Sequence, residues 1–306
     1  MTSPFGPLVL IANPRAGRGK VGEALPKIER ILTETGLDYR VVQTAHPGHA
    51  TQAARDALRG GERYLVAAGG DGTVHEVLNG MIAGDQPIAA DAVLGVVAAG
   101  SGSDFVRSFG LPGDAVEAAH HLAGDSVQAI DVGKITCTAA AAEVTRYFAN
   151  IAQAGLGGAV VARSATLPGF LGPAKYVSAF WLMLPGFRPS TVRVDADGEA
   201  FCWRAHNVVV ANCRFYGGGM HISPKSKPDD GALDVLVMVG PKSDAFTIVP
   251  KVYRGTHLPH RNIVELRANR VRVETDLPFQ IEADGETLGT TPATFEVIRT
   301  PIRVKV

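Results

Sequence analysis

The chain has 306 residues, and its 30 Lys and Arg residues balance 30 Asp and Glu residues, so the formal net charge at pH 7 is zero. This balance argues against sequence-independent binding to nucleic acid, which needs a basic surface. The three cysteines are scattered without disulfide or zinc-site spacing, and the sequence contains no signal-peptide pattern or apolar run of about 18 residues. We therefore expect a cytoplasmic protein without a nucleic-acid partner, and the length favours two domains.

The first third of the chain alternates short apolar runs with helical patterns, as βαβ units around a parallel sheet do. The sequence predicts strands at 8–12, 39–44, 64–68 and 93–98, and helices at 21–35, 50–58, 73–81 and 115–122. Pro26 is tolerated only in the first turn of its helix, and Gly36 is suited to the C-cap. We expect these elements to form an α/β domain over residues 1–126.

From Val127 onward the pattern changes to β-rich segments separated by Gly, Pro, Asp and Asn turns, which is typical of an antiparallel sandwich. The predicted strands are 127–135, 146–152, 190–195, 200–210, 232–239, 263–273, 279–283 and 294–306. Two helical insertions are predicted, at 158–187 and 244–253. We expect a second, all-β domain over residues 127–306.

Three strand-to-helix turns of the first domain are rich in glycine, at residues 13–20, 69–73 and 100–104. The carboxyl ends of parallel strands share one sheet edge, where helix N-termini offer N–H groups to a phosphate. In the second turn a carboxylate beside a phosphate would be repulsive without a metal between them, so we interpret Asp71 as an organiser of Mg²⁺ and phosphate, with Thr73 as a hydroxyl donor. The alternative is a tight turn in which Asp71 caps the helix that follows.

The other two turns carry weaker signals. Residues 17–22 form a G-x-G-x-x-G pattern, but four residues separate it from the strand, and a Walker A match fails as well. Arg15, Arg18 and Lys20 suit phosphate counter-charges, or else they are solvated loop cations. Ser101 and Ser103 of the third turn offer hydroxyls, with a serine-capped helix start as the alternative.

In this order and spacing the three turns resemble the diacylglycerol kinase catalytic domain family, which includes bacterial lipid kinases and the sphingosine and ceramide kinases. The matching segments are residues 13–17, 69–80 and 100–107, followed by 130–133, 148–157, 224–233 and 284–286. The resemblance implies a nucleotide-binding α/β N-terminal domain and a C-terminal β-sandwich that binds a lipid substrate, with the active site between them. It also allows the last strand region of the chain to return to the first domain.

The resemblance also implies the site residues. It assigns catalytic roles to Glu286, as the general base, and to Asp71. An additional Mg²⁺ would be held by the Asp230 carboxylate with the carbonyls of Lys227 and Ala232. The alternatives are an exposed hairpin residue at position 286 and an ion-free turn at 229–231. ATP would be bound by Asn13, Pro14, Arg15, Ala16, Gly17, Thr44, Gly69, Gly70, Asp71, Gly72, Thr73, Val74, His75 and Ser101. Family members commonly have Thr and Asn where this chain has Ser101 and Ser103, which puts nucleotide choice or catalytic strength in doubt.

The implied function is an ATP- and Mg²⁺-dependent lipid kinase of phospholipid biosynthesis, with diacylglycerol as the first choice of acceptor and phosphatidic acid as the product. Residues 167–187 are the candidate acyl-chain or membrane-interface segment, unless they pack on the sandwich core. Residues 251–261 are basic enough to face anionic head groups, or form a solvated face. We expect peripheral contact with the inner face of the membrane and leave a homodimer open. The alternatives are a kinase of a soluble alcohol, as in NAD kinases, and a non-catalytic nucleotide-binding regulator.

Overall fold

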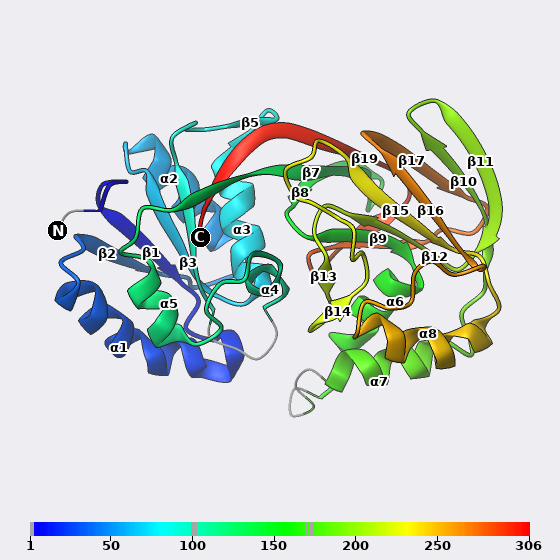
Figure 1. Cartoon of the computed structure of the whole chain (residues 1–306), viewed down its shortest axis with the longest axis horizontal. Helices are drawn as coiled ribbons and strands as arrows, with labels where there is room; N and C mark the ends of the chain where they lie inside the picture. Colours follow the sequence, from blue (N-terminus) through cyan, green and yellow to red (C-terminus); the bar gives the residue numbers. More distant parts are fainter. Residues whose placement is uncertain (1–2, 99–102, 169–170, 172–173) are drawn as a thin grey trace. The chain divides into compact units, whose positions relative to one another are not determined.

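Figure 1 shows the fold, a computed structural model that describes residues 3–98, 103–168, 171 and 174–306. The chain divides into two compact units, one formed by residues 1–132 with 299–306 and the other by residues 133–298. Two strands belong in part to each unit, β7 (Val127–Ala139) and β19 (Glu286–Lys305). In the described part of the chain, no helix combines the length and the apolar character needed to cross a membrane.

A five-stranded parallel sheet forms the centre of the first unit, in the order β19, β6, β3, β1, β2. Its strands β1, β3 and β6 are buried along their whole length, as expected for a parallel sheet covered on both faces. Strand β19 enters the sheet through Arg303 and Val304, which pair with β6. The strand bounds are β1 Leu8–Ala12, β2 Tyr39–Gln43, β3 Tyr64–Gly69 and β6 Val93–Ala98.

Helices surround this sheet in Figure 1. Helices α1 and α5 pack their apolar side chains, such as Ile28 and Ala119, into one core with the sheet. Helix α1 begins at Lys20, so Pro26 lies in its second turn and not in the first, where we expected it. The helix bounds are α1 Lys20–Glu34, α2 His49–Arg59, α3 Asp71–Met81, α4 Asp104–Phe109 and α5 Ala115–His121, and β4 (Ile82–Ala83) and β5 (Gln86–Pro87) form a small hairpin.

The second unit is made of antiparallel strands, and its largest apolar core includes Phe148, Phe279 and Phe295. Three segments predicted as single strands, 146–152, 200–210 and 263–273, are each divided between two strands at a bend of one or two residues. The two strands on either side of each bend pair with different neighbours, so each bend marks a change of partner strand. The strand bounds are β8 Ala142–Phe148, β9 Ile151–Gly155, β10 Ser190–Ala196, β11 Glu199–Ala205, β12 Asn207–Ala211, β13 Phe215–Tyr216, β14 Met220–His221, β15 Leu233–Met238, β16 Ile263–Ala268, β17 Arg270–Thr275 and β18 Gln280–Ala283.

Helices occupy both predicted insertions of the second unit: α6 (Leu156–Ser164), α7 (Ala174–Met183) and α8 (Ala245–Val252). Helices α6 and α7 share a small core around Leu156 and Ala179. The parallel α/β unit and the antiparallel all-β unit confirm the predicted fold class.

Candidate functional site

The first two predicted turns of the first unit meet at the carboxyl edge of its sheet. Ala12 pairs with both Gln43 and Ala68, so the residues that follow these strands are neighbours. The Thr44 N–H donates to the Ala12 carbonyl at 2.8 Å, and the Asn13 N–H donates to the Ala68 carbonyl at 2.9 Å. One edge therefore presents Asn13, Thr44 and the turn that begins at Gly69, while Ser101 lies outside the described residues.

The first turn is wound by three successive residues with left-handed φ angles, 60° at Gly17, 64° at Arg18 and 88° at Gly19. The Asn13 side chain begins the turn, since its Oδ1 accepts the N–H of Arg15 at 3.1 Å. Lys20 then opens helix α1. The turn places exposed cationic residues beside the sheet edge, where phosphate is the natural counter-ion.

Close packing explains the second turn. A Cβ on Gly69 would lie 2.2 Å from Thr73 Oγ1, so only glycine leaves room for that side chain. The side chains of Thr73, Val74 and His75 are buried, and the N–H groups of Thr73 and Val74 donate to the Gly70 carbonyl. Of the predicted residues in this turn, 70–72 are partly exposed, so they are the ones that can face a ligand.

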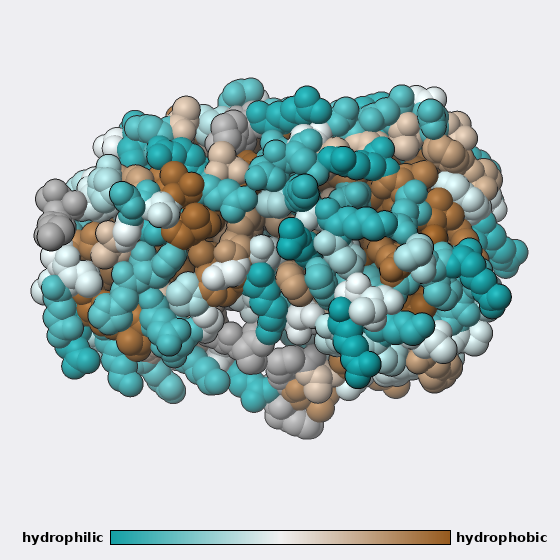
Figure 2. All heavy atoms as spheres, viewed as in Figure 1, coloured by the Kyte–Doolittle hydropathy of each residue, from teal (hydrophilic) through white to brown (hydrophobic). Residues whose placement is uncertain are grey.

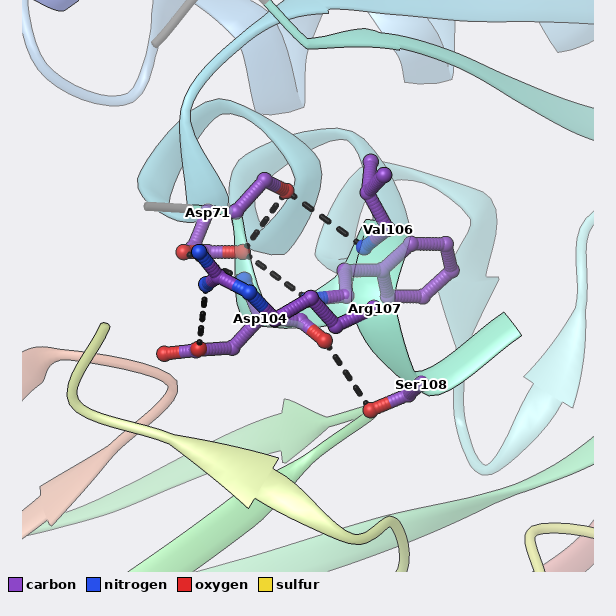
Figure 3. A network of polar contacts seen from close by, with 7 residues as sticks. Asp71, Asp104, Val106, Arg107 and Ser108 are labelled. Atoms are coloured by element: carbon purple, nitrogen blue, oxygen red, sulfur yellow. Dashed lines mark hydrogen bonds and ion pairs between the residues drawn. The ribbon is translucent and has the colours of Figure 1, made fainter. Parts of the chain in front are cut away.

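Asp71 joins the second turn to the third. Its carboxylate accepts the N–H groups of Asp104 and Phe105 and the hydroxyl of Ser103, each at 3.1 Å. Figure 3 shows this side chain pointing at the first turn of α4. We considered Asp71 as a cap of its own helix, α3, but it caps a different helix, where the N-terminal partial charge favours an anion.

The electrostatics of Asp71 are unusual. Burial of the carboxylate is the main cause that raises its pKa to about 7, and the negative charge of Asp104 raises it further, against the three hydrogen bonds that lower it. Asp104 is itself held by Arg107, whose Nη1 lies 3.2 Å from Asp104 Oδ1 (Figure 3). The negative charges of these two neighbouring carboxylates repel each other, and a hard divalent cation such as Mg²⁺ beside them would reduce that repulsion. Sequence reasoning named Asp71 and left Asp104 out of the site, although it lies in the matched segment 100–107.

The end of the second matched segment has a structural role. Both carboxylate oxygens of Glu76 accept backbone N–H groups at the start of α2, from Gly48 at 2.9 Å and Ala50 at 3.0 Å. A Cβ on Gly80 would lie 2.4 Å from the Thr51 carbonyl, so glycine lets α2 and α3 approach closely. These residues therefore hold the loop that follows Thr44.

Glu286 begins β19 in the second unit, directly after the two-residue turn Asp284–Gly285. Both turn residues have positive φ, 47° and 88°, as a type I′ hairpin requires. The Asp284 carboxylate accepts the N–H groups of Ala149, Asn150 and Ile151 at 2.8 to 3.1 Å. The hairpin is thus fixed to the β8–β9 turn, while the Glu286 side chain is exposed.

The loop with Lys227, Asp230 and Ala232 lies beside β16. Arg267 Nη2 is 2.6 Å from Asp230 Oδ2, and the Ala232 N–H donates to Asp230 Oδ1 at 3.3 Å. Arg267 is half exposed, so this ion pair is weak and a divalent cation could replace it. Across the described residues, no group of three or more His, Cys, Asp or Glu side chains is arranged to hold a metal. Backbone carbonyls or substrate phosphates would have to complete any Mg²⁺ site.

Comparisons with known proteins agree with this arrangement. The family model "Diacylglycerol kinase catalytic domain" matches residues 7–135, and "YegS C-terminal NAD kinase beta sandwich-like domain" matches residues 150–306. A diacylglycerol kinase of Bacillus subtilis (strain 168) is 30% identical over 292 residues, covering 94% of this chain and 91% of that protein. One of Staphylococcus haemolyticus (strain JCSC1435) is 28% identical, with coverages of 96% and 86%. A crystal structure of a diacylglycerol kinase from Bacillus anthracis str. Sterne has a TM-score of 0.73 and 25% identity, covering 99% of this chain and 97% of that one.

Proposed function

Because this chain belongs to the diacylglycerol kinase family and is a lipid kinase, we propose that it transfers the γ-phosphoryl group of ATP to the hydroxyl of diacylglycerol, forming phosphatidic acid. One observation carries the proposal. Glycine-rich turns lie at the carboxyl edge of a parallel sheet, and the Asp71 carboxylate links the second of them to the start of α4 by hydrogen bonds. Such an edge, with helix N-termini and nearby cations, suits a polyphosphate.

In this proposal the first unit binds ATP and the second binds the lipid. The phosphates lie against the turns that begin at Asn13 and Gly69, and Thr44 and Ser101 complete the nucleotide site. Backbone N–H groups and Arg15 stabilise the negative charge of the phosphates. Asp71 would hold Mg²⁺, directly or through water, and the ion would supply positive charge to the phosphates of ATP. A further Mg²⁺ at Asp230, with the carbonyls of Lys227 and Ala232, stays a prediction.

Glu286 acts as the general base. A lipid hydroxyl has a pKa far above 7, so its attack is helped by a carboxylate that accepts the proton as the bond to phosphorus forms. The new bond joins the lipid oxygen to the γ-phosphorus, the bond from that phosphorus to the β–γ bridging oxygen breaks, and ADP leaves. Asp284 and Gly285 hold the backbone from which Glu286 projects.

An open and mostly apolar cavity on the surface of the second unit supports a lipid acceptor. Its volume is about 470 Å³, which lies within the range of small-molecule sites, and Leu182, Phe187, Leu277 and Phe279 contribute to its walls. Leu182 belongs to α7, within the segment 167–187 that the sequence analysis selected. We propose that an acyl chain occupies this cavity.

Exposed apolar side chains surround the same helices. Leu182 is 60% exposed and Phe246 of α8 is 67% exposed, and the Phe246 ring stacks on Trp181 of α7 at 4.9 Å. Figure 2 shows apolar residues among polar ones along the lower edge, where Figure 1 places α7 and α8. We propose that this surface contacts the membrane. The basic stretch 251–261 contributes less than its composition suggests, because His257 is buried and its low pKa, caused by burial, keeps it neutral.

The test of the proposed function is a lipid panel. Purified protein is incubated with ATP, Mg²⁺ and dispersed diacylglycerol, a sphingoid base, a glycolipid or a soluble alcohol, and products are identified by mass spectrometry. We expect phosphatidic acid from diacylglycerol. Phosphorylation of the soluble alcohol alone would favour the NAD kinase-like alternative, and tight ATP binding without any product would favour a regulator.

Replacement of Leu182 by Asp should weaken binding to phosphatidylcholine vesicles that contain diacylglycerol by about tenfold or more. The reason is that a leucine side chain contributes about 1.5–3 kcal/mol when it is removed from water. The matched control is Val116→Asp on α5 of the first unit, since Val116 is also exposed and apolar. Equal loss of vesicle binding in both variants, measured by co-sedimentation, would contradict a specific role of α7.

A further inference from the structure

Three buried polar side chains form a hydrogen-bonded series that ends at the Glu286 hairpin. Glu282, Gln153 and Asn207 are 2%, 1% and 7% exposed, and they lie on β18, β9 and β12. Glu282 is the cross-strand partner of Gln153, while Asn207 is diagonal to Gln153, so all three share one sheet face. Buried polar groups must be hydrogen-bonded to be tolerated, which makes their bonding pattern informative.

The hydrogen bonds run in one continuous series. The Gly285 N–H donates to Glu282 Oε2 at 2.9 Å, and Gln153 Nε2 donates to Glu282 Oε1 at 2.6 Å. Asn207 Nδ2 donates to Gln153 Oε1 at 3.0 Å, and the Gly157 N–H donates to Asn207 Oδ1 at 3.0 Å. The series therefore connects the catalytic hairpin to the start of α6.

Both ends of this series are backbone N–H donors. An amide side chain accepts on one side and donates on the other, and a flip of the amide only reverses that direction. A series between two donors therefore needs one member that accepts on both sides, which a carboxylate does and an amide cannot do. Glu282 is this member, and no rearrangement of amides can replace it.

A second hairpin of the same unit provides a comparison. Residues 195–199 read Asp-Ala-Asp-Gly-Glu and residues 282–286 read Glu-Ala-Asp-Gly-Glu, and both Asp–Gly turns have positive φ at both residues. Asp195 also accepts a turn N–H, that of Gly198 at 3.1 Å. Asp195 is half-buried, whereas Glu282 is buried and bonded onward to Gln153. The two hairpins thus share local geometry and differ in what lies behind them.

We propose that Glu282 is a positioning residue for catalysis: with Gln153 and Asn207 it locks the Gly285 backbone, and thereby the direction in which Glu286 projects. The proposal rests on the proposed function, in which Glu286 is the base. The lock works by geometry, because Glu282 accepts the N–H of the residue immediately before Glu286 while its other oxygen is fixed by a neighbouring strand.

The first test is Glu282→Gln, which leaves one pair of N–H groups facing each other in the series. We expect kcat for lipid phosphorylation to fall by about tenfold to a hundredfold, the scale of a misplaced reacting group. The KM for ATP should stay within about twofold, because the ATP turns belong to the first unit. Asp195→Asn is the matched control and should leave kcat unchanged.

Two double variants test whether the series needs one side chain that accepts hydrogen bonds on both sides. Glu282→Gln with Gln153→Glu, and Glu282→Gln with Asn207→Asp, each move the carboxylate to another position of the series and restore one acceptor-only member. We expect both to recover kcat to within about threefold of the wild type, together with the melting temperature. If Glu282→Gln does not fold, kcat and the melting temperature of the double variants test the proposal.

The proposal is overturned by a folded Glu282→Gln protein with wild-type kcat, by equal losses in Glu282→Gln and Asp195→Asn, or by double variants that regain thermal stability without regaining kcat. The last outcome would leave the series with a structural role only. Failure of the proposed function is distinguishable, because then the wild type itself forms no phosphorylated lipid. Failure of the base assignment shows separately, as full activity in a Glu286 variant.

Discussion

Replacement of Glu286 by glutamine should lower kcat for diacylglycerol phosphorylation by about a hundredfold to ten-thousandfold, the usual contribution of a general base. Glutamine has nearly the same shape but cannot accept the proton of the attacking hydroxyl. Because the Glu286 side chain is exposed, the free energy of unfolding should change by no more than about 0.5 kcal/mol. Initial rates with saturating ATP and dispersed lipid, and urea unfolding of the same preparations, measure both quantities.

The chain supplies a matched control for this substitution. Glu199 follows an Asp–Gly turn of the same type and is also exposed, so Glu199→Gln makes the same chemical change in the same local setting. We expect wild-type kcat for Glu199→Gln. A Glu286→Gln protein that retains full kcat would contradict the base assignment, and equal losses in the two variants would point to an effect on the fold of the second unit.

These twin hairpins show where sequence reasoning stops. The sequence predicts turn residues between the strands 190–195 and 200–210 and offers an exposed hairpin residue as the alternative for position 286, and the structure has an Asp–Gly hairpin at both places. The assignment of Glu286 as the base came from resemblance to a family. The structure adds a physical difference, since Glu282 connects one hairpin to Gln153 on a strand that lies 129 positions away in the sequence. Contacts over such separations leave no local pattern in a single sequence.

The first unit was predictable because its signals are local. Continuous apolar runs gave β1, β3 and β6, and helical periodicity gave α1 and α2. The first two glycine-rich turns were placed correctly at the sheet edge for the same reason, while residues 100–102 of the third lie outside the described part of the chain. In the second unit, the bend at Ala149 and Asn150 was missed, because it is stabilised by the distant Asp284 carboxylate.

The role of Asp71 was predictable only in part. The pattern of glycines around it indicated a ligand-facing turn, but not that its carboxylate would cap α4, more than 30 positions later in the sequence. Capping changes what the residue can do, because the same helix N-terminus that stabilises its negative charge also fixes its direction. A carboxylate that is oriented in this way and still has a raised pKa is one that a bound cation would stabilise further.

Asp71→Asn should lower kcat/KM for lipid phosphorylation by at least about a hundredfold, since the neutral amide cannot organise Mg²⁺ and has no second oxygen for the α4 N–H groups. A conservative control is Asp114→Asn at the N-cap of α5, where the side chain also accepts two helix N–H groups away from the proposed site. We expect that control to retain wild-type kcat/KM. Equal losses in the two variants would assign the effect to helix capping alone.

Stability against pH provides an independent test of the same residue in metal-free buffer. The Asp71 pKa is raised to about 7 in the folded protein, so the folded state binds this proton more tightly than the unfolded state between about pH 4 and 7. The stabilisation that this bound proton gives the folded state is therefore complete below pH 4 and is lost as the pH rises through 7.

Asp71→Asn removes this dependence on pH. The free energy of unfolding of the variant relative to the wild type should therefore rise by up to about 4 kcal/mol between pH 4 and 8. A difference between the two proteins that stays constant across this range, measured by urea unfolding, would show that Asp71 is an ordinary ionised carboxylate, and the electrostatic reason for expecting a cation beside it would be lost.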